Sequence, residues 1–134
     1  MSLPMKRAVI YTNVLVSSAL SSEGNSAKIM NLISDKKIQL FYSSAIIDEY
    51  RRVLAYKKLK IMPQTQRRII NAIEDVGILI EPAASIISFT DESDRVFYDT
   101  AQASKAILIT GNLKHYPAET FIKNPADFLD MFTD

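Results

Sequence analysis

The sequence predicts an α/β fold with a central parallel sheet. Short apolar runs that end at small polar residues alternate along the chain with segments of helical spacing. One run, 106–109, contains no polar residue, as strands buried on both faces of a parallel sheet require. The length of 134 residues suffices for one domain, expected over residues 6–134, with residues 1–5 as a tag or disordered N-terminus.

The first half of the chain is expected to form two strands and four helices. Residues 7–10 are apolar after Arg7 and stop at Tyr11-Thr12-Asn13, which is typical of a buried strand that ends in a polar loop. A β-rich run predicts the second strand at 38–42, and helical spacing predicts helices at 14–20, 25–34, 44–57 and 63–76. The residues expected at helix boundaries are Asn25 or Ser26, Ser43 or Ser44, Pro63 and Gly77.

The second half continues the alternation. Residues 86–89 are too short a run to assign. Strands are predicted at 78–81, 106–109 and near 121–122, with helices at 92–104 and after Pro125. Asp91 and Asn124 are the expected caps of these two helices.

Four polar positions are expected to meet at one edge of the sheet. Ligands of open parallel sheets bind beyond the C-terminal ends of the strands. The four positions are Tyr11 after the first strand, Glu49 on the third helix, Asp94 opening the fifth helix and Asn112 after the fourth strand. Each also has a simpler explanation: a solvated helix acid, an acid favoured by the helix dipole, or a turn residue.

Composition limits the chemistry. The chain has no cysteine, which excludes disulfides and thiolate zinc sites, and its single histidine, His115, excludes a multi-histidine metal site. Any metal would be held by oxygen ligands, which favours magnesium or manganese. No apolar stretch approaches the ~18 residues of a membrane span, so a cytoplasmic location is expected.

Four ordered motifs resemble those of PIN-domain proteins. They are residues 9–17 (VIYTNVLVS), 48–54 (DEYRRVL), 91–97 (DESDRVF) and 110–117 (TGNLKHYP). The match runs from about residue 6 to about residue 129, nearly the whole chain. The branch that it most resembles is the VapC-like toxin component of bacterial toxin–antitoxin systems.

This resemblance implies a three-layer α/β/α fold and a magnesium- or manganese-dependent endoribonuclease that cuts single-stranded RNA. Carboxylates hold such a cation, which lowers the pKa of bound water. It also implies a cognate antitoxin as partner, and a homodimer is considered as well. Carried over by position, Glu49 and Asp94 are metal ligands and catalytic residues, Asn112 is a ligand or orients water, and Thr12 and Asn13 support the site by hydrogen bonds.

Tyr11 departs from the pattern, because it stands where the family carries its first metal-binding aspartate. A phenol has a pKa near ~10, so Tyr11 brings no charge at pH 7. Only Glu49 and Asp94 then remain anionic, and weak metal binding is expected. The alternative to the ribonuclease is a catalytically degenerate PIN-like domain that binds RNA or an antitoxin without cleaving. A flavodoxin-like nucleotide binder would need a Gly-rich loop after the first strand, and the sequence has none there.

Cations are concentrated between residues 51 and 68, where the sequence contains no acid. A local positive surface of this kind attracts phosphate. Solvated helix faces explain the same charges equally well. The residues expected to bind RNA are Arg51, Arg52, Lys57, Lys58 and Lys60.

Overall fold

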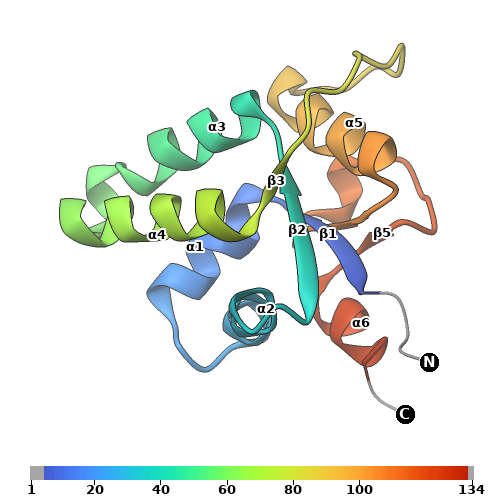
Figure 1. Ribbon diagram of the computed structural model, residues 1–134. Helices are drawn as coiled ribbons and strands as arrows, with labels where there is room; N and C mark the ends of the chain where they lie inside the picture. Colours follow the sequence, from blue (N-terminus) through green and yellow to red (C-terminus); the bar gives the residue numbers. More distant parts are fainter. Residues whose placement is uncertain (1–4, 133–134) are drawn as a thin grey trace.

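A five-stranded, all-parallel sheet forms the centre of the protein in the computed structural model, which describes residues 5–132 (Figure 1). Apart from Met5, the segment expected to be a tag or disordered lies outside the described residues. The sheet order is β3-β2-β1-β4-β5. The strands are β1 (Lys6–Ile10), β2 (Ile38–Tyr42), β3 (Ile78–Leu79), β4 (Ile107–Ile109) and β5 (Ile122–Lys123). The prediction of an α/β fold with a parallel sheet is confirmed.

Helices cover both faces of the sheet, which gives the three-layer arrangement. The chain moves in one direction from β1 to β3 and then crosses back to β4, so right-handed crossovers place α5 on the face opposite α1 to α4. The α-helices are α1 (Thr12–Leu20), α2 (Asn25–Ser34), α3 (Ser44–Leu54), α4 (Pro63–Val76), α5 (Arg95–Ser104) and α6 (Pro125–Asp130). Three 3₁₀ turns are η1 (Lys57–Leu59), η2 (Glu92–Asp94) and η3 (Leu113–His115).

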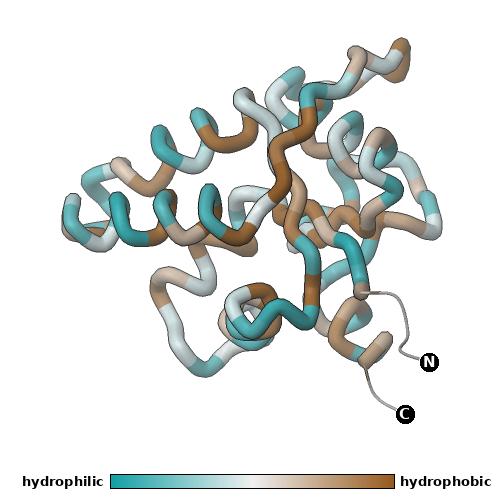
Figure 2. The backbone as a smooth tube through the Cα atoms, viewed as in Figure 1, coloured by the Kyte–Doolittle hydropathy of each residue, from teal (hydrophilic) through white to brown (hydrophobic). Residues whose placement is uncertain are grey.

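The core lies on both faces of the central strands. Ala8, Val9 and Ile10 are consecutive and all at most 1% exposed, as are Leu108 and Ile109 in the neighbouring strand. Figure 2 colours the backbone by hydropathy. The strands are mainly hydrophobic, whereas hydrophobic and polar residues alternate along the helices, whose polar positions face solvent. Among residues 5–132, no helix combines the length and apolarity needed to cross a membrane.

Local capping signals identify some helix starts correctly. The Ser43 hydroxyl accepts a hydrogen bond from the backbone N–H of Ile46, and Asn124 Oδ1 accepts one from Asp127 N–H. The prediction for α2 is wrong, because Gly24 occupies the N-cap position and Asn25 is already helical.

Several element boundaries differ from the prediction. α1 begins at Thr12, where a polar loop was expected, and α5 begins at Arg95, after the 3₁₀ turn η2. α3 ends at Leu54, short of residue 57, because the chain changes to i→i+3 hydrogen bonds such as Tyr56 N–H to Val53 O. β3 has two residues where four were predicted. Ile80 N–H still donates to Tyr42 O, but the chain then leaves the sheet edge. Residues 86–89 form neither helix nor strand.

Candidate functional site

The start of α1, which follows β1 after Tyr11, and the loop after β4 lie side by side at the point where the chain direction across the sheet reverses. This is the position where open α/β sheets bind ligands. Tyr11 N–H donates to Ile109 O at 2.9 Å, and Gly111 N–H donates to Asn13 Oδ1 at 3.2 Å. A Cβ on Gly111 would lie 2.7 Å from Asn13 Nδ2, so a larger residue there would force the Asn13 side chain to shift. The start of α1 and the loop after β4 are therefore held together.

Asp94 lies at the centre of the candidate site. It ends η2 immediately before α5 and is only 3% exposed. The Tyr11 hydroxyl donates to Asp94 Oδ1 at 2.7 Å, and His115 Nδ1 lies 3.3 Å from Asp94 Oδ2. The Tyr116 hydroxyl donates to the backbone carbonyl of Asp94 at 3.0 Å. Both carboxylate oxygens therefore already have partners within the protein.

The ring of Tyr11 is anchored among other aromatic side chains. It makes edge contacts with Phe97 and Tyr116, at centroid distances of 5.0 and 5.9 Å. Burial raises the pKa of Tyr11 well above its usual value, and the hydrogen bond to the Asp94 carboxylate raises it further, while the side chain of Asn112 opposes this shift. Tyr11 consequently remains a protonated donor across the physiological pH range.

Glu49 is committed to a different partner. Arg52, one turn along α3, donates to both of its carboxylate oxygens at 2.7 Å. Within the described residues, no hydrogen bond or ion pair joins Glu49 to Tyr11, Asp94 or Asn112. The structure thus brings Tyr11, Asp94 and Asn112 together and leaves Glu49 paired on its own helix.

The residues expected to support the site differ in what they do. Asn13, in the first turn of α1, accepts the bond from Gly111 that joins this helix to the loop after β4. The Thr12 hydroxyl is buried and has no hydrogen-bond partner in the part of the chain that the structure describes. Asn112 opens η3, and its backbone N–H donates to Thr110 Oγ1 at 2.9 Å.

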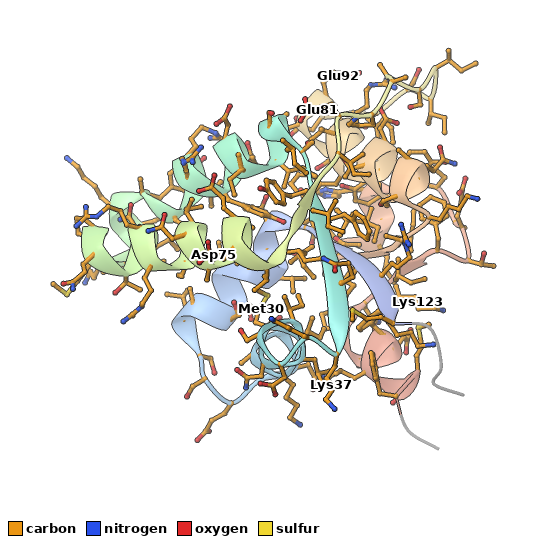
Figure 3. The ribbon with its side chains drawn as sticks, viewed as in Figure 1. Met30, Lys37, Asp75, Glu81, Glu92 and Lys123 are labelled. Carbon is orange, nitrogen blue, oxygen red and sulfur yellow. The ribbon has the colours of Figure 1, made fainter. Side chains whose placement is uncertain are left out.

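Other acids at this edge of the molecule are also engaged. Figure 3 shows Glu81 and Glu92 near the start of α3 and the start of α5. Glu81 accepts a hydrogen bond from Ser44 N–H, which lowers the pKa of its carboxyl, and Glu92 pairs with Arg95 at 2.6 Å. Asp91 accepts a bond from the backbone N–H two residues along, which lowers the pKa of Asp91.

The arrangement does not fit a divalent cation. Across residues 5–132, no three His, Cys, Asp or Glu side chains are grouped so that they could hold a metal ion. A cation needs several anionic oxygens directed at one point, whereas Asp94 faces the Tyr11 hydroxyl and His115, and both oxygens of Glu49 face Arg52. As arranged, these side chains bind one another.

Sequence reasoning missed two contacts in this site. His115 is not among the residues expected at the site, yet its Nδ1 lies 3.3 Å from Asp94 Oδ2. The pairing of Arg52 with Glu49 is also unexpected, since the sequence predicts that Arg52 binds RNA. The available signals were the three-residue spacing of Glu49 and Arg52 and the position of His115 three residues after Asn112.

The basic surface comprises seven exposed cations on α3, η1, α4 and the turn between η1 and α4. They are Arg51, Arg52, Lys57, Lys58, Lys60, Arg67 and Arg68. Arg51 lies 3.3 Å from Asp48 and 3.5 Å from Glu74, and Arg52 binds Glu49. The other five form no ion pair within the described range, so their charge is available to a ligand.

Comparison with known proteins identifies the family. The family model of the PIN domain matches residues 7–114. The uncharacterised protein MJ1680 of Methanocaldococcus jannaschii is 34% identical over 109 residues, which cover 79% of this chain and 70% of that protein.

A similar fold occurs in the crystal structure of VapBC2 from Rickettsia felis bound to a DNA fragment from their promoter. The TM-score is 0.54 and the identity 16%, with 81% of this chain and 89% of that chain covered. At that identity the likeness is one of fold. The match of the family model over most of the sequence, carried by the motifs described above, shows that the chain belongs to the PIN-domain family.

Proposed function

We propose that this chain is a PIN-domain protein of the toxin type that binds single-stranded RNA without cutting it. The observation that carries the proposal is the hydrogen bond from Tyr11 to Asp94. It places a neutral donor at the position of the family's first aspartate and occupies an oxygen of the most buried acid of the site.

Electrostatics support the loss of cleavage. Replacing a carboxylate by a phenol removes one full charge at a few ångströms from any bound cation, an interaction of about 4 kcal/mol per unit of cation charge at an effective dielectric near 20. Magnesium gives up its water ligands reluctantly and needs anionic oxygens to replace them. The remaining acids, Glu49 and Asp94, are already paired with Arg52, Tyr11 and His115.

The basic surface supports RNA binding. Lys57, Lys58 and Lys60 lie on or next to η1, are exposed, and form no ion pair with any acid within residues 5–132. Such cations release counterions on binding phosphate, so affinity for single-stranded RNA falls with salt, with a slope of about −0.7 per phosphate contact.

A specific observation also favours a protein partner. An apolar groove of about 160 Å³ runs between α1, α2 and α4, lined by Leu15, Met30, Ile69 and neighbouring residues. The VapBC2 complex, which has a similar fold, supports an antitoxin as this partner. An amphipathic helix is the kind of ligand that such a groove accepts.

The deciding experiment compares the wild-type protein with Tyr11→Asp. A labelled single-stranded RNA is incubated with each protein in magnesium or manganese, and both cleavage and binding are measured. We expect the wild type to bind without cutting and Tyr11→Asp to gain metal-dependent cutting. Robust, EDTA-sensitive cutting by the wild type that Glu49→Gln abolishes would contradict the proposal.

A second measurement tests the RNA surface. Charge reversal at Lys57, Lys58 and Lys60 should weaken binding and make the salt slope shallower by about 2. Unchanged binding would remove the basic surface from the proposal.

A further inference from the structure

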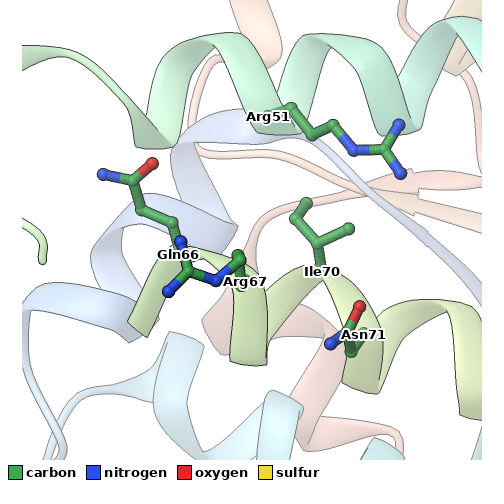
Figure 4. Close-up of a pocket in the computed structure, with 5 residues that line it drawn as sticks. All are labelled: Arg51, Gln66, Arg67, Ile70 and Asn71. Atoms are coloured by element: carbon green, nitrogen blue, oxygen red, sulfur yellow. The ribbon is translucent and has the colours of Figure 1, made fainter. Parts of the chain in front are cut away.

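A polar pocket lies between α3 and α4, on the basic surface. Figure 4 shows its lining, with Arg51 above on α3 and the other side chains on α4. The cavity measures about 280 Å³. It is lined by Arg51, Gln66, Arg67, Ile70 and Asn71.

The pocket combines an apolar wall with two amides. Ile70 is 6% exposed and contributes the apolar surface. Gln66 Nε2 donates to Ile61 O at 2.8 Å, which fixes the amide and leaves Gln66 Oε1 as an acceptor. Asn71 is exposed, and its side-chain amide makes no hydrogen bond to any described residue. An apolar wall with amide donors and acceptors is the chemistry that holds a nucleobase.

The two arginines differ in how strongly they are held. Arg51 lies between Asp48 and Glu74, but all three side chains are 43–75% exposed and the distances are 3.3 and 3.5 Å. Ion pairs of this kind contribute little and can exchange for a phosphate. Arg67 pairs with no acid in the part of the chain that the structure covers. The phosphates on either side of a bound base would therefore meet one free and one exchangeable guanidinium.

We propose that this pocket binds one nucleotide of a single-stranded RNA. The base lies on Ile70 with its edge against the amide of Asn71, and Gln66 lies at the other end of the pocket (Figure 4). The phosphates on either side of the base lie against Arg51 and Arg67. This inference rests on the proposed RNA binding and adds a place where a base is recognised.

The pocket is independent of the acidic site. Arg51 follows Glu49 by two residues, which is about 200° around α3, so the two side chains leave opposite sides of the helix. The pocket side of α3 faces α4, and η1 with its lysines connects the same two helices. RNA bound along η1 reaches the pocket without contacting Asp94.

Matched variants test the pocket. Asn71→Ala removes an amide from the pocket without changing charge, and Gln64→Ala removes an exposed amide of the same helix outside it. Arg67→Ala and Arg68→Ala each remove one charge, but only Arg67 lines the pocket. Affinity for a labelled single-stranded RNA is measured by fluorescence anisotropy at fixed salt, after thermal unfolding shows that all four variants fold.

We expect Asn71→Ala to weaken binding about 3- to 10-fold, the effect of one lost hydrogen bond, and Gln64→Ala to leave it unchanged. Arg67→Ala should weaken binding more than Arg68→Ala. With an abasic RNA, the difference between Asn71→Ala and wild type should disappear, because no base remains to be read.

A small-molecule probe separates base recognition from general anion binding. Adenosine monophosphate should shift the NMR signals of the Asn71 side-chain amide, and inorganic phosphate should not. Equal effects of the two probes, or equal affinities of Asn71→Ala and Gln64→Ala, would overturn the pocket while leaving RNA binding intact. A wild-type protein that binds no RNA even at low salt would refute the proposed function, and the pocket with it.

Discussion

Replacement of Tyr11 by phenylalanine tests how strongly the phenol holds the candidate site. Tyr11→Phe keeps the ring contacts and removes only the hydroxyl that donates to Asp94 at 2.7 Å. The Asp94 side chain is 5% exposed, so water does not readily replace the lost donor. We therefore expect the fold to survive with a clear loss of stability.

The magnitude follows from the type of bond. A hydrogen bond to a charged group contributes about 1.5–3 kcal/mol. An unfolding entropy of about 2.1 cal/mol/K per residue over 134 residues gives about 280 cal/mol/K, so each kcal/mol lowers the Tm by about 3.6 °C. Tyr11→Phe should accordingly lower the Tm by about 5–11 °C.

The assay is urea and thermal unfolding of a double-mutant cycle with Asp94→Asn, for which we expect a coupling of about 1.5–3 kcal/mol. Tyr42→Phe is the control, because the Tyr42 residue is 8% exposed and its hydroxyl makes no hydrogen bond within residues 5–132. Equal Tm losses for Tyr11→Phe and Tyr42→Phe, or a coupling near zero, would refute the reasoning.

Three further predictions concern other parts of the fold. Asn124→Ala should destabilise the protein by about 1 kcal/mol in urea unfolding, because α6 loses its cap. Asn124→Asp should keep most of the wild-type stability, because aspartate also caps helices. Gly111→Ala should cost about 1–3 kcal/mol, because its Cβ would meet the side chain of Asn13, and a second change, Asn13→Ala, should recover part of this loss. Burial and the bond to Glu119 raise the pKa of Tyr98 from 10.0 to about 12. The folded state therefore holds this proton more tightly, and the stability that Tyr98 contributes should be lost as the pH rises between these values; a Tyr98→Phe variant, followed by phenolate absorbance, should show a shallower alkaline loss.

The sequence predicts those parts of the fold whose cause is local or periodic. Alternating apolar runs and helical stripes are enough for the strand order along the chain and the parallel class. Ser43 and Asn124 are identified because a cap acts within three residues. The ends of α3 and β3 are missed, because they depend on hydrogen bonds to Val53 and Tyr42 and on where the chain leaves the sheet.

The candidate site was likewise predictable from the sequence only in part. Topology alone places Tyr11, Asp94 and Asn112 near one another, because each follows or faces a strand end. Which partner a carboxylate takes depends on side-chain rotamers that packing selects. The spacing of Glu49 and Arg52 permits their pairing, but only the structure shows that Arg52 takes both carboxylate oxygens and that His115 approaches Asp94.

The position of β1 in the sheet has a consequence for synthesis. Ala8 pairs on one side with Leu40 and on the other with Ile107, so the two neighbours of this strand leave the ribosome at very different times. Until β4 emerges, β1 exposes an apolar edge with unpaired backbone groups, which is a template for pairing with another chain. Closing the sheet on that side joins distant segments and is expected to be the slow step of folding. A nascent chain that is stalled on the ribosome before residues 107–109 emerge should therefore be the form of this protein most dependent on chaperones.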